Sequence, residues 1–284
     1  MTMKPSRRRA VDPRRFEVDR ALLHRGGAPR GWGNLGDWSV ARSYEGACEA
    51  LAIRVGLAAK LSGNQAILEA ACGAGEGMRV WLERFGVRHV IGLDVHPDLA
   101  AEAHARLIAI AAPARWRVDA GDATDLSAAA RATLDAVVCV DAAYHFDTRD
   151  DFLREAGRVL RPGGRLALTD VVLDREPRSA LEEIAVDGIA RVCAIPRENL
   201  GPEETYVARL RRAGFDGIAV ERLDDEVLAG FSSFVGEHCR AHGRETFGAG
   251  WPKLLFTAWG AGLARRRGWL HYVLASARRA PDSV

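Results

Sequence analysis

Residues 67–77 read ILEAACGAGEG, an apolar run that contains one acid, Glu69, and continues into three glycines spaced two apart. The apolar run predicts a short buried strand. The glycines predict a turn whose backbone can approach a ligand with no Cβ atom in the way. In an open parallel α/β sheet, ligands bind beyond the carboxyl ends of the strands, where such a turn lies. The stretch therefore predicts a nucleotide-type site beside an acid.

Strand and helix patterns alternate on both sides of this turn. The predicted strands are residues 66–70, 89–94, 114–123, 134–142, 164–173, 216–223 and 268–279. The predicted helices are residues 40–61, 75–86, 96–112, 148–160, 178–195 and 202–215, with a mostly helical stretch at 225–267. This alternation predicts an α/β fold, a doubly wound and mostly parallel seven-stranded sheet with helices on both faces.

The composition excludes several classes of protein. The 40 basic and 38 acidic residues leave a net charge of +2, so no bulk field favours nucleic acid. The five cysteines form no C-x-x-C pair, which argues against a zinc site or a disulfide framework and for reduced, cytoplasmic thiols. No apolar run reaches the roughly 20 residues of a membrane span. Residues 1–20 have charge but no apolar core, so we expect no secretory signal.

The spacing of the glycines and the charge of Glu69 reduce the number of ligand classes that fit this turn. A dinucleotide site requires G-x-G-x-x-G, but Met78 stands where the third glycine is needed, and the P-loop lysine is also absent. A carboxylate at this turn would repel a pyrophosphate. A ligand with an ammonium and a sulfonium group would be attracted instead. The pattern therefore favours a cationic sulfur nucleoside over a polyphosphate.

Residues 66–170 resemble a class I S-adenosylmethionine (SAM)-dependent methyltransferase of the group that acts on small natural products and lipids. The resemblance rests on EAACGAGEG, VIGLDV, GDA at 121–123, VVCVDAAYHF and FLREAGRVLRPGGRLALTD, in the family's order. It implies the Rossmann-like methyltransferase fold, with helical additions that form a lid, and SAM as the cofactor. The expected organisation is a mobile basic arm at 1–30 and a single methyltransferase domain at 31–284. Within that domain the SAM-binding core is 66–170 and the lid segments are 174–205 and 225–267.

The resemblance assigns cofactor contacts to residues at the ends of the first two predicted strands. Gly73 and Gly75 would lie against the methionine portion of SAM, and Glu69 would attract its ammonium group. Asp94, 21 residues after Gly73, would accept the ribose hydroxyls. Helix capping by Glu69 and a surface turn at Asp94 are the alternatives.

Two further contacts would complete the nucleoside site. Asp122 would accept from the adenine amino group while the backbone N–H of Ala123 meets the ring, although Asp122 is also compatible with an Asx turn. Val140 or Cys139 would offer a backbone carbonyl.

His145, just past the fourth strand, is the predicted catalytic residue. Methyl transfer to a hydroxyl needs a group that removes the proton, and a histidine is suited to that role. The alternative is a histidine that packs or binds backbone. Asp170, at the end of the fifth strand, is a second candidate base. The sequence predicts no metal site.

Aromatic residues suggest an acceptor pocket. The loop GWGNLGDWS at 31–39 resembles a segment that folds over the cofactor in these enzymes, so Trp38 and Tyr44 would line the SAM or acceptor pocket. Tyr144 would join them under the lid, together with aromatics of 225–267, namely Phe231, Phe234, Trp251 and Trp259. Packing alone is the alternative for each.

The expected activity is methyl transfer from SAM to oxygen of a small apolar or aromatic secondary metabolite, with a small-molecule acceptor as partner and a homodimer allowed. C-methylation of an indole ring or of an isoprenoid, including an isoprenoid diphosphate, is the alternative. A diphosphate acceptor would imply Mg²⁺ and could be met by the arginines at 7–9, 14–15, 211–212 and 265–267, for which solvated surface positions are the alternative. A SAM-binding protein or cyclase that transfers no methyl group is a third hypothesis, and an NAD-dependent oxidoreductase is disfavoured by the glycine spacing.

Overall fold

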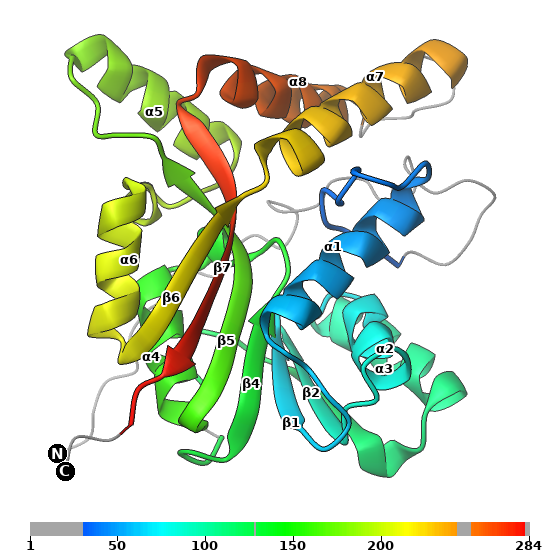
Figure 1. The fold of residues 1–284 in the computed structure, drawn as a ribbon. Helices are drawn as coiled ribbons and strands as arrows, with labels where there is room; N and C mark the ends of the chain where they lie inside the picture. Colours follow the sequence, from blue (N-terminus) through cyan, green and yellow to red (C-terminus); the bar gives the residue numbers. More distant parts are fainter. Residues whose placement is uncertain (1–30, 128, 243–250, 282–284) are drawn as a thin grey trace, which may run out of the picture.

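A computed structural model describes residues 31–127, 129–242 and 251–281 of the chain. Within these residues seven strands form one sheet in the order β3-β2-β1-β4-β5-β7-β6, with all strands parallel except β7 (Figure 1). This confirms the predicted fold class. The predicted arm at 1–30 lies outside the described residues.

The elements follow the predicted alternation. The strands are β1 (Ala66–Ala70), β2 (His89–Asp94), β3 (Trp116–Ala120), β4 (Leu134–Cys139), β5 (Leu160–Leu173), β6 (Phe215–Arg222) and β7 (Leu270–Arg279). The α-helices are α1 (Tyr44–Ala58), α2 (Glu76–Glu83), α3 (Pro97–Ile110), α4 (Arg149–Val159), α5 (Ala180–Val192), α6 (Glu203–Arg212), α7 (Gly230–His242) and α8 (Trp251–Arg267). Short turns of other helix types are η3 (Pro113–Arg115), η4 (Ala143–His145), η5 (Arg197–Asn199) and the π-helical η6 (Asp224–Ala229).

Both faces of the sheet are buried, which explains the apolar run of residues 136–139 in β4. The side chains of this run alternate between two clusters, because successive residues of a strand point to opposite faces. Ala136 and Val138 belong to the cluster that includes residues of α1 and α2. Val137 and Cys139 belong to the cluster that includes residues of α4 and α6. A parallel sheet covered in this way reads as apolar at every position.

Local signals define where the helices begin. Ser43, Thr148 and Ser179 cap α1, α4 and α5 by accepting a hydrogen bond from a backbone N–H of the first turn. Acidic residues follow in each of these first turns, where they complement the helix dipole. In contrast, α2 begins at Gly75 with no side-chain cap from any described residue.

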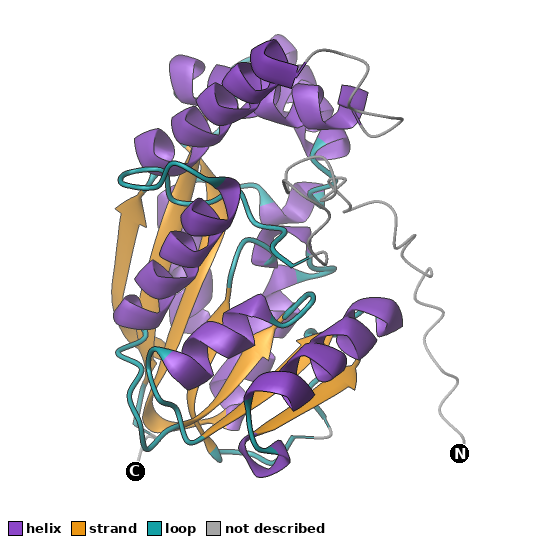
Figure 2. Cartoon of the chain, turned by 90° about the vertical axis from the view of Figure 1, so that its right-hand side faces the viewer, coloured by secondary structure: helices purple, strands orange, loops and turns teal. Residues whose placement is uncertain are grey.

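The last strand runs against the others because of where the chain enters it. β6 ends at the carboxyl edge of the parallel strands, and η6, α7 and α8 then stay beyond that edge (Figures 1 and 2). β7 therefore begins at this edge and runs back between β5 and β6. The loops after β1, β2, β3 and β4 therefore lie at the same edge of the sheet as these helices.

The boundaries differ most from the prediction at two strands. β3 spans only Trp116–Ala120, because Pro113 begins a separate 3₁₀ turn before it. β5 begins earlier than expected, at Leu160, which pairs with Leu134 before the register shifts. The shift accommodates Gly163, whose φ of +79° suits glycine.

Candidate active site

A cavity of about 620 Å³ lies at the carboxyl edge of the sheet. One end is lined by the loops after β1, β2, β3 and β4 and by residues 31–35 of the N-terminal loop. The other end is lined by α5, α8 and the start of β7. We call α5 and α8 the cap helices; both lie in the predicted lid segments. Ligands bind at this edge in doubly wound folds, so the cavity is the candidate site.

The glycine-rich turn forms the floor of the first end. Gly73 and Gly75 have φ values of +54° and +83°, a region that favours glycine. A Cβ on Gly75 would lie 2.9 Å from Cβ of Ala103 on α3, so this glycine is required by helix packing. A Cβ on Gly73 would have no neighbour within 4 Å among the described residues, although Gly73 lines the cavity. Gly73 is thus the glycine that leaves room for a ligand.

Asp94 braces this turn from the neighbouring strand. The side chain is 5% exposed and lines the cavity. Oδ2 accepts a hydrogen bond from the Gly73 N–H at 2.8 Å, and Oδ1 accepts one from the His96 N–H at 2.9 Å. Each carboxylate oxygen has a second lone pair. Asp94 therefore shapes the turn and also presents acceptors to the cavity.

Glu69 lies at the base of the turn, 3% exposed. Its Oε2 accepts from Nε1 of Trp81 at 2.8 Å, and a Cβ on Gly77 would collide with the carboxyl group. Burial raises the pKa of Glu69 from 4.5 to about 8, an effect that the Trp81 bond opposes and the charge of Asp94 reinforces. Gly77, absent from the predicted contacts, makes the space for this acid.

The ligand-free protein should lose stability as the pH rises, through Glu69. A carboxyl whose pKa is higher in the folded state stabilises fully below its unfolded pKa of about 4.5, and the effect disappears as the pH rises through about 8. Glu69→Gln cannot ionise, so its free energy of unfolding should exceed that of the wild type increasingly from pH 5 to pH 8.5. The gap should reach a few kcal/mol, at about 1.4 kcal/mol per pKa unit.

Urea unfolding at a series of pH values measures this gap. Glu83→Gln, which replaces a half-exposed acid of α2, is the matched control, and its curve should run parallel to that of the wild type. If the Glu69→Gln curve also ran parallel, the buried carboxyl would not be the source of the pH dependence.

Two predicted nucleoside contacts also line the cavity. Oδ1 of Asp122 accepts from the N–H and the Oγ1 hydroxyl of Thr124 at 2.8 and 2.7 Å, which is the Asx turn considered as an alternative. Asp122, Ala123 and Val140 all lie on the cavity wall. Asp122 thus forms the Asx turn and also lies on the cavity wall, and its contact with adenine stays a prediction.

His145 is held in one orientation at the junction of the two ends. Its Nδ1 lies 3.1 Å from the carbonyl oxygen of Ala194, just after α5. Because a carbonyl only accepts, Nδ1 must carry the proton, and a neutral ring then has Nε2 as its acceptor nitrogen. The ring also packs on Tyr144, with centroids 4.2 Å apart. The structure thus holds the ring in the tautomer that a general base requires.

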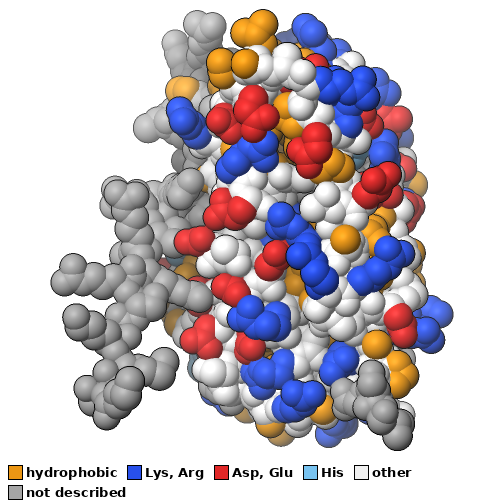
Figure 3. Space-filling view, turned by 90° about the vertical axis from the view of Figure 1, so that its left-hand side faces the viewer, with side chains coloured by type: hydrophobic (Ala, Val, Ile, Leu, Met, Phe, Trp, Pro, Cys, Tyr) orange, Lys and Arg blue, Asp and Glu red, His pale blue; other side chains and the backbone are white. Residues whose placement is uncertain are grey.

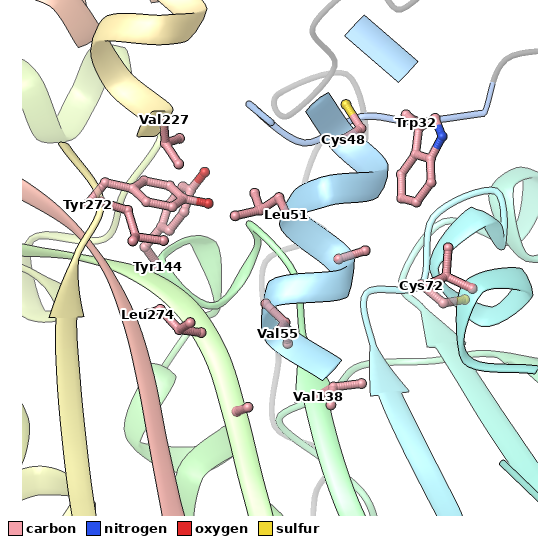
Figure 4. Close-up of a cluster of buried hydrophobic side chains, with 14 of the residues drawn as sticks. Trp32, Cys48, Leu51, Val55, Cys72, Val138, Tyr144, Val227, Tyr272 and Leu274 are labelled. Carbon is pink, nitrogen blue, oxygen red and sulfur yellow. The ribbon is translucent and has the colours of Figure 1, made fainter. Parts of the chain in front are cut away.

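Asp141, which sequence reasoning missed, joins three parts of the site. Its Oδ1 accepts from the hydroxyls of Tyr144 and Tyr272 at 2.6 and 2.7 Å, and its Oδ2 accepts from the N–H of Leu35 at 2.6 Å. Figure 4 shows the two tyrosine side chains next to one another. Burial raises the pKa of Asp141, and these hydrogen bonds oppose the shift. Tyr144 lines the cavity as predicted, but its hydroxyl is committed to Asp141.

Trp38 and Tyr44 are not among the residues that line the cavity. Trp38 stacks on Phe234 with ring centroids 4.4 Å apart, and its Nε1 donates to the carbonyl of Leu35. Tyr44 is 2% exposed and donates to the carbonyl of Asn34 at 2.8 Å. Both hold the N-terminal loop, so the packing alternative describes them. The aromatic residue of this loop that reaches the cavity is Trp32.

Asp170 is also absent from the cavity wall. It is fully buried and forms an ion pair with Arg149, with Oδ1 2.7 Å from Nη1. Burial raises the pKa of Asp170, and Arg149 opposes the shift. Because side chains alternate along β5, Val171 faces the cavity and Asp170 faces α4. The prediction that Asp170 lies in the substrate pocket is therefore wrong.

The second end of the cavity is mainly apolar. The cap helices contribute Ile189, Phe256 and Trp259, and the last two are 45% and 55% exposed. Of the other aromatics predicted here, Phe231 is in the core and Phe234 packs on Trp38. The Trp251 side chain lies outside what the structure describes.

Charge is distributed unevenly over the cavity wall. Its described residues include six acids and neither lysine nor arginine. The acids are Glu69, Glu76, Asp94, Asp122, Asp141 and Asp147. Elsewhere both signs mix, as on the face in Figure 3, and Arg265 pairs with Asp225 at 2.6 Å. Burial raises the pKa of Glu69 and of Asp141, so these two acids add full negative charge only when a bound cation favours their ionised form. The wall therefore favours a cationic ligand over a polyphosphate.

Neither a membrane span nor a metal cluster occurs among the described residues. No helix there has the length and hydropathy needed to cross a membrane. In the same ranges, no group of three His, Cys, Asp or Glu side chains is arranged to hold a metal ion.

Comparisons with known proteins place this geometry in context. Residues 67–164 match a family model described as a methyltransferase domain. The chain is 34% identical over 207 residues to the erythromycin 3''-O-methyltransferase of Saccharopolyspora erythraea, covering 69% of this chain and 65% of that protein. It is 30% identical over 167 residues to methyltransferase GfsG of Streptomyces halstedii, covering 58% of each. The chain thus spans less than two thirds of these two relatives.

Solved structures share the fold. The [4+2]-cyclase SpnF superposes with a TM-score of 0.70 at 19% identity, covering 93% of this chain and 92% of that one. The geranyl diphosphate C-methyltransferase of Streptomyces coelicolor superposes with a TM-score of 0.65 at 18% identity, covering 93% and 88%. At such identities the likeness concerns the fold alone.

Proposed function

The chain belongs to the class I SAM-dependent methyltransferases of the natural-product type, and on that premise we propose that it methylates a hydroxyl group of a small apolar or aromatic secondary metabolite, with His145 as general base. The observation that carries the proposal is the cavity itself. An acidic end with a glycine turn meets an apolar end, and an oriented histidine lies where they join.

The residues at the acidic end fit the cofactor of this family. Gly73 leaves open space beside the turn, and Asp94 has acceptor capacity for ribose hydroxyls. Glu69 would hold the ammonium group of SAM, directly or through water. Asp122, the Ala123 N–H and the backbone near Val140 complete the nucleoside site. The absence of lysine and arginine from the described wall favours this cation over a nucleotide phosphate.

In the mechanism the protein mainly positions the acceptor beside the cofactor and removes the proton of its hydroxyl group. Bound SAM supplies an electrophilic methyl group on a positively charged sulfur. His145 accepts the hydroxyl proton of the acceptor at Nε2, and the carbonyl of Ala194 keeps the Nδ1 proton in place. The apolar side chains of the cap helices hold the acceptor and exclude water. No described residue group offers a metal site for this chemistry.

The relatives support oxygen as the methylated atom. The erythromycin 3''-O-methyltransferase has the highest identity of the relatives named above, and its name specifies an oxygen acceptor on a natural product. Exposed Phe256 and Trp259 extend the apolar end toward solvent. An acceptor larger than the cavity could therefore insert its reactive end and rest on these rings.

C-methylation of an isoprenoid diphosphate is the second candidate, because the fold is shared with a geranyl diphosphate C-methyltransferase. The two hypotheses differ in their need for Mg²⁺. We expect activity to remain within twofold after dialysis against EDTA, since the described cavity wall has no cation to meet a diphosphate and no metal cluster. Loss of activity that Mg²⁺ alone restores would instead favour the diphosphate acceptor.

A protein that binds SAM without transferring its methyl group is the third candidate, given the shared fold of a cyclase. Incubation with methyl-labelled SAM and extracts of the source organism, followed by mass spectrometry, tests the proposal. A labelled product with S-adenosylhomocysteine formed in equal amount is expected. Tight SAM binding by calorimetry without labelled product or S-adenosylhomocysteine would favour the third candidate. Binding of NADH in place of SAM would reject the family site.

A further inference from the structure

The backbone on both sides of His145 is held by the side chain of Asn199, a residue distant in the sequence. The side-chain amide of Asn199 donates to the carbonyl of Tyr144 at 3.1 Å and to the carbonyl of Phe146 at 2.7 Å. These carbonyls belong to the residues immediately before and after His145. Asn199 is 1% exposed and comes from η5, more than 50 residues further along the chain. One buried amide therefore clamps the backbone of the candidate base.

The ring of His145 is held by the same part of the chain. Ala194, whose carbonyl meets Nδ1, lies between α5 and η5 and has a φ of +54°. Its position is set by the end of α5, where the N–H of Ile195 donates to the carbonyl of Ala190 at 2.8 Å. Residues 194–199 thus determine both the backbone and the ring orientation of His145. The same segment continues from α5, which lines the acceptor end of the cavity.

A buried ion pair orders Asn199 in turn. The Arg149 N–H donates to Oδ1 of Asn199 at 3.2 Å, and Nη2 of Arg149 donates to the Asn199 carbonyl at 2.6 Å. Nη1 of Arg149 pairs with Asp170, and its guanidinium lies 4.7 Å from the ring centre of Tyr206. A buried arginine is costly unless its charge is paired. Asp170 supplies that charge, which gives a role to a residue that does not reach the cavity.

We propose that Asn199 is a positioning residue for the reaction. Its amide clamps the Tyr144 and Phe146 carbonyls, so that the neutral ring of His145 carries its proton on Nδ1 and keeps Nε2 as the base. The proposal rests on the proposed function of His145 and adds a residue that touches neither the cofactor nor the acceptor. A merely structural role for Asn199 would affect stability without changing the tautomer of His145.

The tautomer can be read without any acceptor. In full-length protein labelled with ¹⁵N-histidine, long-range ¹H–¹⁵N correlation distinguishes a protonated ring nitrogen from an unprotonated one, and the His145 signals are those missing from His145→Ala. The wild type should show the proton on Nδ1. Asn199→Ala should show a mixture that includes the Nε2-protonated form favoured in water. Once an acceptor is known, kcat of Asn199→Ala should be at least tenfold below that of the wild type, and the acid limb of its pH–rate profile should be displaced. Its KM for SAM should stay within twofold of the wild-type value.

Two further variants make the result decisive. Asn199→Asp keeps the size and the oxygen that accepts from Arg149 but lacks both N–H donors, so it should behave as Asn199→Ala does and replaces it if the alanine variant does not fold. Leu107→Ala removes a fully buried side chain from α3, on the other half of the sheet, and should lower the melting temperature while the tautomer and the acid limb stay unchanged.

The outcomes separate this inference from the proposed function. If both Asn199 variants kept the wild-type tautomer and pH profile, the positioning role would be wrong, whatever His145 does. If the tautomer changed but His145→Ala retained full turnover, the clamp would stand and the base assignment would fail.

Discussion

His145→Ala should lower turnover at least about a hundredfold while SAM still binds with wild-type affinity. The reason is that general base catalysis contributes roughly two to four orders of magnitude, and the alanine variant has no group at Nε2 to accept the hydroxyl proton. His145→Asn should lose as much, although its amide can still donate toward the Ala194 carbonyl. The measurements are steady-state methyl transfer for kcat, single-turnover transfer for the chemical step, and calorimetry for SAM affinity.

The controls for this prediction separate a base from a packed ring. His104→Ala replaces an exposed histidine of α3 that does not line the cavity, and it should retain turnover. If His145→Asn were as active as the wild type, the ring would serve orientation or packing alone. That outcome would leave the family assignment in place, because the family match does not depend on His145.

Asp94→Ala should weaken SAM binding about a hundredfold. The variant loses the proposed hydrogen bonds to the ribose hydroxyls, and it releases the Gly73 N–H that shapes the turn. Hydrogen bonds to a charged group are worth about 1.5–3 kcal/mol each, so two of them correspond to a hundredfold or more. Asp98→Ala, an exposed acid on the first turn of α3, is the matched control and should bind SAM normally.

An analogue distinguishes ribose binding from bracing of the turn. The wild type should bind S-adenosylhomocysteine more tightly than its 2′-deoxy analogue, and Asp94→Ala should bind both equally. Equal preference in the two proteins would mean that Asp94 acts only through the turn.

The sheet was predictable because its strands carry local signals. Apolar runs located every strand, and their alternation with helical patterns predicted the mostly parallel sheet. The direction of β7 was less accessible, since it depends on α7 and α8 remaining at one edge of the sheet. No residue pattern in β7 itself distinguishes the two directions.

The site was predicted in part, for the same reason. Glu69, Asp94 and His145 stand in contiguous motifs and do line the cavity. Asn199 carries no local signal, because its partners lie about 50 residues away and only the fold brings them together. The face of β5 that carries Asp170 could not be read from the sequence, because apolar residues cover both faces of the sheet. In the structure Asp170 shares a face of β5 with Leu168 and Val172, two positions away on either side, and both belong to the cluster on the face of α4.

The two ends of the cavity come from different lengths of chain. The nucleoside end is built largely from one stretch between residues 69 and 140, together with residues 31–35, and the acceptor end is built largely from residues 185–195 and 256–272. Selection for a new acceptor can therefore rewrite the second group of residues and leave cofactor recognition intact. Segment exchange between relatives would follow the same boundary, provided that the incoming segment brought with it the carbonyl and the amide that now steady the histidine.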